Sequence, residues 1–352
     1  MLKFFTKNPN HFSLIDSEYK LSGFIPYLYH LDEKTVYTKD NQLLQVIKVG
    51  GFSFETADDD DVDIKKNIRN FLFKGMADPS INLYFHIIRK KQDVYQNLSN
   101  NVDMPDGFAN YLDKKWIEKH KYHKGFSNEL YVTVSYKVKK NLDISFLEDI
   151  AAKFRKTGKK QVQNDSMVEG FEQLQESSNR IANSLRQYNP KVLGVVERNG
   201  QRYSEIAEFF SSILNCGNPS NVLLGSGKLD RLLMNSRMYF GKRAIEIKCL
   251  DGSSRFAGMV SLKEYSPKTW AGMMDSFLQM PFEFVITQSF QFINRQIAIA
   301  KMQLQQNRMI QAGDKAISQI AGISEALDMA MSGEIAFGTH HLTVMCIGDS
   351  LK

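Results

Sequence analysis

The stretch AIEIKCLDGSSRFAGMVSL, residues 244–262, decides how the second half of this sequence is interpreted. Two alternating apolar runs flank the pair Asp251-Gly252, a strong local signal for a tight turn between two antiparallel strands. After this hairpin we expect a helix near residues 268–279, the strand FEFVITQSF, a long helix, and the final strand HLTVMCIG. The segment therefore predicts the element order ββαβαβ.

The same order is expected earlier in the chain. Residues 34–49 alternate around the turn KDNQ and predict a first hairpin. A helix follows the aspartates at 58–61, because acidic residues favour a helix N-terminus. The strands INLYFHII and ELYVTVSYKV complete the unit, with a charged helix at 107–122 between them. The apolar face of the first helix is expected to comprise Ile64, Ile68, Phe71, Leu72 and Gly75.

This recurrence predicts an α+β fold: two ferredoxin-like split α/β units of ββαβαβ order, joined and flanked by long helices. We divide the chain into a first α/β unit at 1–145, a helical connector with one strand at 146–235, and a second α/β unit at 236–352. The two units resemble each other in element order and not in residues, so their duplication is a hypothesis.

Two helical stretches carry apolar stripes at three-and-four spacing. The long helix of the second unit, 293–331, has a stripe whose phase slips, and Gly313 divides or bends it. Packing inside the chain is the favoured interpretation of both stripes, and contact with another subunit is the alternative. The stripe of the connector comprises Met167, Phe171, Leu174, Ile181, Leu185 and Tyr188, with Ser178 in the remaining place.

The composition is that of a packed globular protein. The 352 residues are 43% hydrophobic. The 45 basic and 39 acidic residues give a net charge of +6 without a basic block, so the composition does not require a nucleic-acid partner. Cys216, Cys249 and Cys346 are odd in number and far apart, which favours buried thiols in a reducing compartment. No run approaches the roughly 18 apolar residues of a membrane span, so we expect any membrane association to be peripheral.

Residues 221–230, NVLLGSGKLD, imitate the phosphate-binding turn of an ATPase. Val222 stands where the first glycine is required, and Leu229 stands where a hydroxyl would hold Mg²⁺. We therefore predict a loop with a solvated Lys228. Asp349 follows the last strand, as the Mg²⁺-binding aspartate of such motors follows a strand. The sequence lacks the phosphate-binding loop with which that aspartate would act. The loop is expected to lead into a short amphipathic helix with Leu229, Leu232 and Leu233.

No catalytic, cofactor-binding or metal-binding residue is predicted in this chain. His340 and His341 adjoin on a strand and point to opposite faces, so we interpret them as structural. One segment combines lysines with aromatic rings, which suits a phosphate backbone or anionic lipid heads. A solvated helix anchored by Trp116 and Ile117 is the favoured interpretation. The segment comprises Lys114, Lys115, Trp116, Lys119, Lys121, Tyr122 and Lys124.

Five phrases in this order resemble a single family. They are FIPYLYHLDEKTVYTKDNQLLQVIKVGGFSFET, NELYVTV, SRMYFGKRAIEI, KEYSPKTWAGMMDSFLQMPFEFVITQSFQFINRQ and FGTHHLTVMCIGDSL. Together they are similar to the N-terminal region of the large type IV secretion ATPases, the CagE/TrbE/VirB family. The resemblance runs from about Gly23 to Leu351.

The resemblance implies a bacterial cytoplasmic protein, peripheral at the inner membrane, whose C-terminal motor binds ATP and Mg²⁺ and assembles as a hexamer. That motor would power conjugation, pilus biogenesis and transfer of DNA or effectors. We expect the motor to lie beyond Lys352, so neither a cofactor nor enzyme activity is expected in this chain. The expected function is a non-catalytic docking and assembly module. Its partners would be its own C-terminal ATPase domain, inner-membrane components of the system and further copies of itself.

Two alternatives stay open. The first is a degenerate nucleotide-binding protein that uses residues 225–228 and Asp349. The second is binding of nucleic acid or anionic lipid through the basic helix at 114–124, which would weaken steeply as salt rises.

Overall fold

The computed structural model describes residues 19–51, 58–92, 107–120, 125–139, 144–158, 165–218, 220–225, 227–266, 270, 272–312 and 317–351. Within these residues the strands are β1 (Tyr27–His30), β2 (Val36–Thr38), β3 (Gln42–Val49), β4 (Ile81–Gln92), β5 (Gly125–Lys137), β6 (Lys191–Val192), β7 (Val195–Arg198), β8 (Gln201–Ser204), β9 (Arg237–Phe240), β10 (Ile245–Lys248), β11 (Ser254–Ser261), β12 (Glu283–Phe292) and β13 (Gly338–Gly348).

The α-helices are α1 (Asp59–Gly75), α2 (Phe108–His120), α3 (Ile144–Thr157), α4 (Asp165–Ser184), α5 (Glu205–Leu214), α6 (Leu229–Leu232), α7 (Arg295–Gln311) and α8 (Ile317–Ser332). Short 3-10 helices are η2 (Leu21–Gly23), η3 (Arg186–Tyr188) and η4 (Asp275–Gln279). Helices and a large antiparallel sheet together confirm the predicted α+β class.

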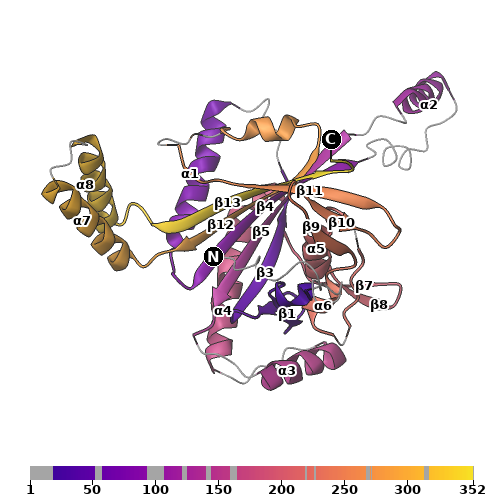
Figure 1. The fold of residues 1–352 in the computed structure, drawn as a ribbon, viewed down its shortest axis with the longest axis horizontal. Helices are drawn as coiled ribbons and strands as arrows, with labels where there is room; N and C mark the ends of the chain where they lie inside the picture. The colour runs from indigo at the N-terminus through magenta and orange to yellow at the C-terminus, as the bar shows by residue number, and fades with distance from the viewer. Residues whose placement is uncertain are drawn as a thin grey trace, which may run out of the picture.

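The main sheet reads almost the same from either edge. Its order is β1-β2-β3-β5-β4-β12-β13-β11-β10-β9, with β6 also paired to β3 and a separate β7-β8 hairpin (Figure 1). The first five strands and the last five repeat one spatial arrangement. Counted from the edge, each half has three consecutive strands (β1-β2-β3 or β9-β10-β11), then the last strand of the half (β5 or β13), and then the fourth strand at the centre (β4 or β12). All the pairs are antiparallel, including the central pair of β4 and β12, in which Ile87 lies opposite Ile286. A pseudo-twofold axis perpendicular to the sheet therefore relates the two halves.

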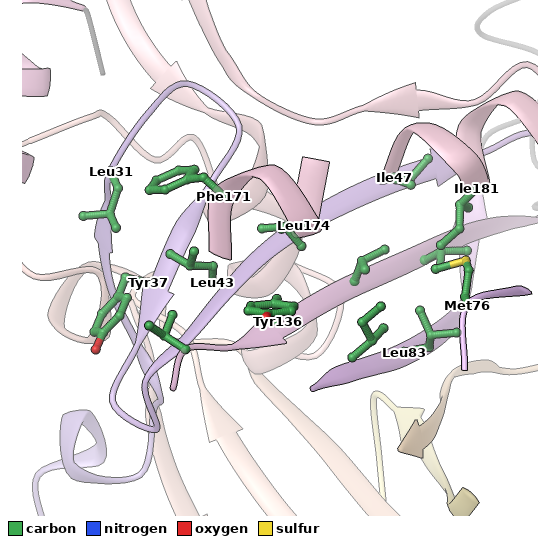
Figure 2. Close-up of a cluster of buried hydrophobic side chains, with 14 of the residues drawn as sticks. Leu31, Tyr37, Leu43, Ile47, Met76, Leu83, Tyr136, Phe171, Leu174 and Ile181 are labelled. Atoms are coloured by element: carbon green, nitrogen blue, oxygen red, sulfur yellow. The ribbon is translucent and has the colours of Figure 1, made fainter. Parts of the chain in front are cut away.

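One face of the first half carries the largest core cluster. The long helix α4 lies against β3 and β5, and α1 lies beside it. Figure 2 shows Phe171, Leu174 and Ile181 of α4 directed at Leu43, Ile47 and Tyr136 of the strands. Every apolar position predicted for the α4 stripe and its extension is buried, and Ser178 is also buried, so the connector stripe serves packing inside the chain.

The opposite face is covered by α5 across both halves. Phe209 and Phe210 join one cluster with Val46 of the first half and with Val285 and Ile347 of the second. The N-terminus of α5 is capped by Ser204, whose hydroxyl accepts the amide of Ala207 at 3.0 Å. The two predicted units therefore share this cover as well as one continuous sheet. The proposed domain boundaries stay a prediction.

Two expected elements differ from the structure. The helix predicted over 293–331 is two helices, α7 and α8, which pack on each other, with Gln306 donating to Ser324 at 2.6 Å. Pairing lets Met309 and Leu327 become buried, which a single protruding helix would leave in solvent. Gly313 lies outside the described residues. The helix expected near 268–279 is only the short η4.

Two smaller expectations also need correction. The connector holds three short strands, β6, β7 and β8, where one was expected. In α1, Leu72 is buried, but Ile64, Ile68 and Phe71 are exposed. Periodicity identifies residues on the same side of a helix, but it does not give the width of the strip that the sheet covers.

Candidate docking surfaces

The lysine of the glycine-rich turn is engaged by a carboxylate. Lys228 Nζ lies 3.3 Å from Glu148 Oε1 and 5.5 Å from the centre of the Tyr29 ring. The Tyr29 hydroxyl donates to the same Glu148 oxygen at 2.6 Å. Hydrogen bonds from Tyr29, the larger contribution, and from Lys228 hold the pKa of Glu148 below its ordinary value. The expectation of a solvated Lys228 is therefore wrong.

The space beside this turn is small. The hollow that Gly225 and Gly227 line together with Tyr29 and Arg155 measures about 10 Å³, room for roughly one water molecule. Beyond the turn, α6 buries Leu229, and Leu233 after it is buried too, while Leu232 is partly exposed. The predicted loop and short amphipathic helix are confirmed, and the hollow as described does not accommodate a triphosphate.

The other residues singled out by sequence have separate partners. His340 Nδ1 lies 2.9 Å from the Tyr265 hydroxyl. Burial is the larger cause, and the charge of His341 the smaller cause, of a lowered pKa of His340. Asp349 forms an ion pair with Lys91 at 3.0 Å. Among the described residues, no three His, Cys, Asp or Glu side chains gather as a metal site.

The three cysteines are free thiols. Cys216 is buried, as expected, and burial raises the pKa of its thiol to about 11. Cys249 and Cys346 are only partly buried, and Asn218 donates to Cys249 Sγ at 2.7 Å. The expectation of buried thiols therefore holds fully for Cys216 alone.

The predicted basic segment is described only in part. Lys114, Lys115, Trp116 and Lys119 lie on α2, which stands apart from the sheet in Figure 1, and Lys115 forms an ion pair with Glu118 at 3.1 Å. The predicted residues Lys121, Tyr122 and Lys124 lie outside the described residues. Trp116 is 47% exposed and Ile117 is partly buried. The same side of α2 also exposes Phe108, Tyr111 and Leu112.

The structure adds a hollow that was not predicted, at the junction of the two halves. We call it the junction hollow; its volume is about 300 Å³. Arg69 of α1, Trp270 and Met273 are among the residues that line it. Trp270 is 64% exposed and Met273 is exposed as well. Its remaining lining residues are Ile87, Gly272, Met274, Asp275, Phe277, Leu278, Phe284, Ile286 and Gln288.

A tight turn shapes the rim of the junction hollow. Gly272 has a φ of +81°, and a side chain there would meet the Asp275 carboxylate at 2.8 Å. The amide of Asp275 donates to the Gly272 carbonyl at 3.0 Å, so the chain reverses into η4. The turn leaves Trp270 and Met273 at the surface. A tryptophan close to Met273, Met274 and Met280 was the available sequence signal, since these residue types are frequent at protein interfaces.

Buried polar groups join the elements on the other face. His86 Nδ1 of β4 lies 3.1 Å from the Thr287 hydroxyl of β12, and His30 Nε2 lies 2.6 Å from Ser204 Oγ. Burial lowers the pKa of each histidine to about 4. Both rings are therefore neutral at pH 7, and their hydrogen bonds link separate parts of the fold.

Each half also holds one carboxylate by basic side chains. Burial alone would raise the pKa of Glu129, but hydrogen bonds from Lys48 at 2.7 Å and Lys90 at 2.9 Å outweigh it and hold that pKa at about 2. In the second half, Glu283 pairs with Arg255, and both side chains are largely buried. The Glu129 contacts join β5 to its neighbours β3 and β4, and the Arg255–Glu283 pair joins β11 to β12 across the intervening strand β13.

None of the helices in the described part of the chain is long and apolar enough to cross a bilayer.

Comparison with protein families gives two matches along the chain. Residues 34–142 match the type IV secretion system ATPase VirB4/TrbE N-terminal domain. Residues 191–352 match the CagE, TrbE, VirB family, described as a component of a type IV transporter system.

Individual relatives extend over nearly all of the sequence. The type IV secretion system protein virB4 of Bartonella henselae is 33% identical over 341 residues, which are 97% of this chain and 42% of that protein. Protein virB4 of Rhizobium radiobacter is 28% identical over 330 residues, and the virB4 protein of Brucella suis is 28% identical over 345 residues. These cover 94% and 96% of this chain. The chain thus spans about 40% of the length of these relatives.

Proposed function

The chain belongs to the CagE/TrbE/VirB family of type IV secretion components, and from this premise we propose that it is a non-catalytic docking and assembly module. In this role it holds the ATP motor of the whole protein against the inner-membrane part of the secretion complex. The complex would carry out pilus biogenesis, conjugation and transfer of DNA or effectors. The module would act at the cytoplasmic side of the inner membrane, within a hexamer.

The junction hollow is the observation that carries this proposal. Trp270 is 64% exposed at a hollow of mixed polar and apolar lining, to which Met273 and Arg69 also contribute. Tryptophan, methionine and arginine are enriched where protein partners bind, and a few such residues usually supply most of the affinity. The hollow lies where both halves of the sheet meet, so a partner bound there would contact both halves.

The two tryptophans of the sequence provide a matched experiment. Trp270→Ala in the full-length protein should reduce co-purification with the inner-membrane components of the system by about tenfold or more, since a central aromatic anchor typically contributes about 2 kcal/mol or more. ATP hydrolysis by the full-length protein should stay unchanged. Trp116→Ala, on α2, is the control and should co-purify normally. Normal co-purification of Trp270→Ala, or loss of hydrolysis with it, would contradict docking through the junction hollow.

A second candidate function concerns α2. Its exposed Phe108, Tyr111, Leu112 and Trp116 follow helical spacing, and Lys114, Lys115 and Lys119 lie among them. This pattern suits a helix that lies on an anionic membrane surface, with rings inserted and lysines at the headgroups. Trp116→Ala should then lower sedimentation with phosphatidylserine vesicles at low salt, while Trp270→Ala should not. No binding of the unaltered chain to these vesicles would exclude the candidate, and retention on DNA instead would favour nucleic acid.

A further inference from the structure

The two edges of the sheet are covered differently. On one edge, β1 contacts α3 and α6. On the other edge, β9 pairs with β10 on one side, and no described strand pairs with it on the opposite side. Arg237, Tyr239 and Phe240 of β9 are exposed, with Phe240 at 71%. An open edge of this kind offers backbone groups that another strand can pair with.

The hydrogen-bond phase shows which backbone groups are available. The Gly241 amide donates to the Ala244 carbonyl at 3.0 Å and closes the β9-β10 turn. Directly opposed residues of antiparallel strands alternate between hydrogen-bonded and non-hydrogen-bonded pairs. Counted from the bonded pair Gly241–Ala244, Tyr239–Glu246 is the next hydrogen-bonded pair. Met238 and Phe240 occupy the non-bonded pairs. Their N–H and C=O groups therefore point outward from the edge.

The edge is positively charged. Arg237, Lys242, Arg243 and Lys248 are exposed, and none of them forms an ion pair within the described part of the chain. Arg237 and Lys248 even lie directly opposite each other, an arrangement that is unfavourable without a compensating anion. The neighbouring carboxylate, Glu246, accepts a hydrogen bond from Ser254 at 2.7 Å. A second copy of β9 would add the same four positive charges, so self-pairing is disfavoured.

We propose that β9 receives an extended acidic segment of a different protein as an added strand. The backbone of Met238 and Phe240 binds the backbone of the segment, and the four basic side chains bind its carboxylates. The side chains of Tyr239 and Phe240 cover its apolar residues. The proposal rests on the docking role above, and it assigns that role a second surface and a partner chemistry.

Three fluorescently labelled synthetic peptides test this with the full chain. One alternates Glu with Val, one alternates Lys with Val, and one has the acidic composition with prolines that prevent strand formation. Anisotropy at low salt should show saturable binding of the first peptide, and at least about tenfold weaker binding of the other two. Equal binding of the basic or the proline-containing peptide would overturn the proposal, as would no binding of the acidic one.

Backbone variants locate the site. Met238→Pro removes an outward N–H without removing a bond to β10, so the fold should persist while acidic-peptide binding falls at least about tenfold. Met238→Ala is the control and should bind normally. Amide exchange in the unaltered chain gives a test that does not depend on folding of the variant. The peptide should protect the amides of Met238 and Phe240, and protection elsewhere would overturn the proposal.

Two further outcomes separate this inference from its alternatives. If the chain alone forms a dimer that Met238→Pro dissolves, the occupant is a second copy and the acidic partner is excluded. Trp270→Ala should leave binding of the acidic peptide unchanged. Failure of the peptide together with the expected Trp270→Ala effect would overturn only the β9 assignment, whereas the reverse pattern would overturn only the role of the junction hollow.

Discussion

On the face of the sheet that carries α1 and α4, the first half is covered by a 20-residue helix, whereas the second half has η4 and its flanking chain. Leu174 of α4 is completely buried against β3 and β5. In the second half Phe284 is completely buried, but Val260 of β11 is 65% exposed on the same face. The same strand order thus supports a thick core in one half and an open surface in the other.

The difference indicates a division of roles. Antiparallel backbone pairing does not depend on which elements cover the sheet, so both halves can share a strand order without sharing the helices that cover it. The segments inserted after the strands decide what is buried. The first half uses its inserted segments for stability, and the second half leaves β9, β11 and the rim of the junction hollow available for contact. Mutations should therefore affect folding more in the first half and binding more in the second.

The largest expected effect tests the two cores directly. Leu174→Ala should lower the free energy of unfolding by about 4 kcal/mol, because a long helix cannot settle into the cavity. Phe284→Ala should cost less, about 3 kcal/mol, although it removes a larger side chain, because the short η4 segment can move to fill the space. Urea unfolding midpoints give both values. Val260→Ala is the exposed control and should change stability by less than about 0.5 kcal/mol. A greater loss for Phe284→Ala would contradict the difference between the halves.

The next effect concerns the last strand of each half, which begins with a glycine in both cases. At Gly338 an added methyl group would collide with the Phe290 ring and lie 2.6 Å from the Gln291 carbonyl oxygen. Gly338→Ala should therefore cost about 1–3 kcal/mol in urea unfolding. Gly322→Ala in α8 is the matched control, because it has open space around it and should stabilise by up to about 1 kcal/mol. Equal effects of the two substitutions would show that the β12-β13 pairing tolerates strain.

A smaller effect is expected from pH, through one histidine of the first half and one at the junction. His30 and His86 have a pKa of about 4 when folded and take up a proton near pH 6.5 when unfolded. Unfolding therefore binds protons between these values, and stability should fall as pH drops from about 6.5 to 4. Each ring contributes a slope of up to about 1.4 kcal/mol per pH unit. Stabilities from urea unfolding between pH 7 and 5 should show about half of the combined slope of the two rings in His86→Gln, and an unchanged slope would refute the contribution of His86.

The predictability of the fold follows from the range of its contacts. Alternation identified β3 and β5, because each strand reveals its own buried face within ten residues or so. The pairing of β4 with β12 joins residues about 200 positions apart, and nothing local in INLYFHII or FEFVITQSF specifies the other as its neighbour. The recurrence of element order was visible in the sequence, while the twofold-related arrangement of the two units in one sheet was evident only from the structure.

The surfaces were less predictable than the strands. Lysines in α2 are evident from composition, so that segment was found, but Arg69 and Trp270 lie about 200 residues apart and meet only through the sheet. Likewise, the stripe of α1 was recognised while Ile64, Ile68 and Phe71 turned out to be exposed. Burial depends on which elements pack together, and periodicity does not contain that information.

The smallest expected effect concerns Lys228, which the sequence offers as a nucleotide-binding residue and the structure pairs with Glu148 at 3.3 Å. Because both side chains are partly exposed, Lys228→Ala should lower the melting temperature by less than about 3 °C. The purified chain should show no ATP turnover above background and no saturable heat with Mg-ATP, and the variant should behave identically. Glu148→Gln is the matched variant, since it also removes the ion pair and keeps the lysine. Hydrolysis that Lys228→Ala abolishes and Glu148→Gln preserves would assign the turn to nucleotide chemistry, and the distinction between a folding half and a contact half would then need a catalytic site added to it.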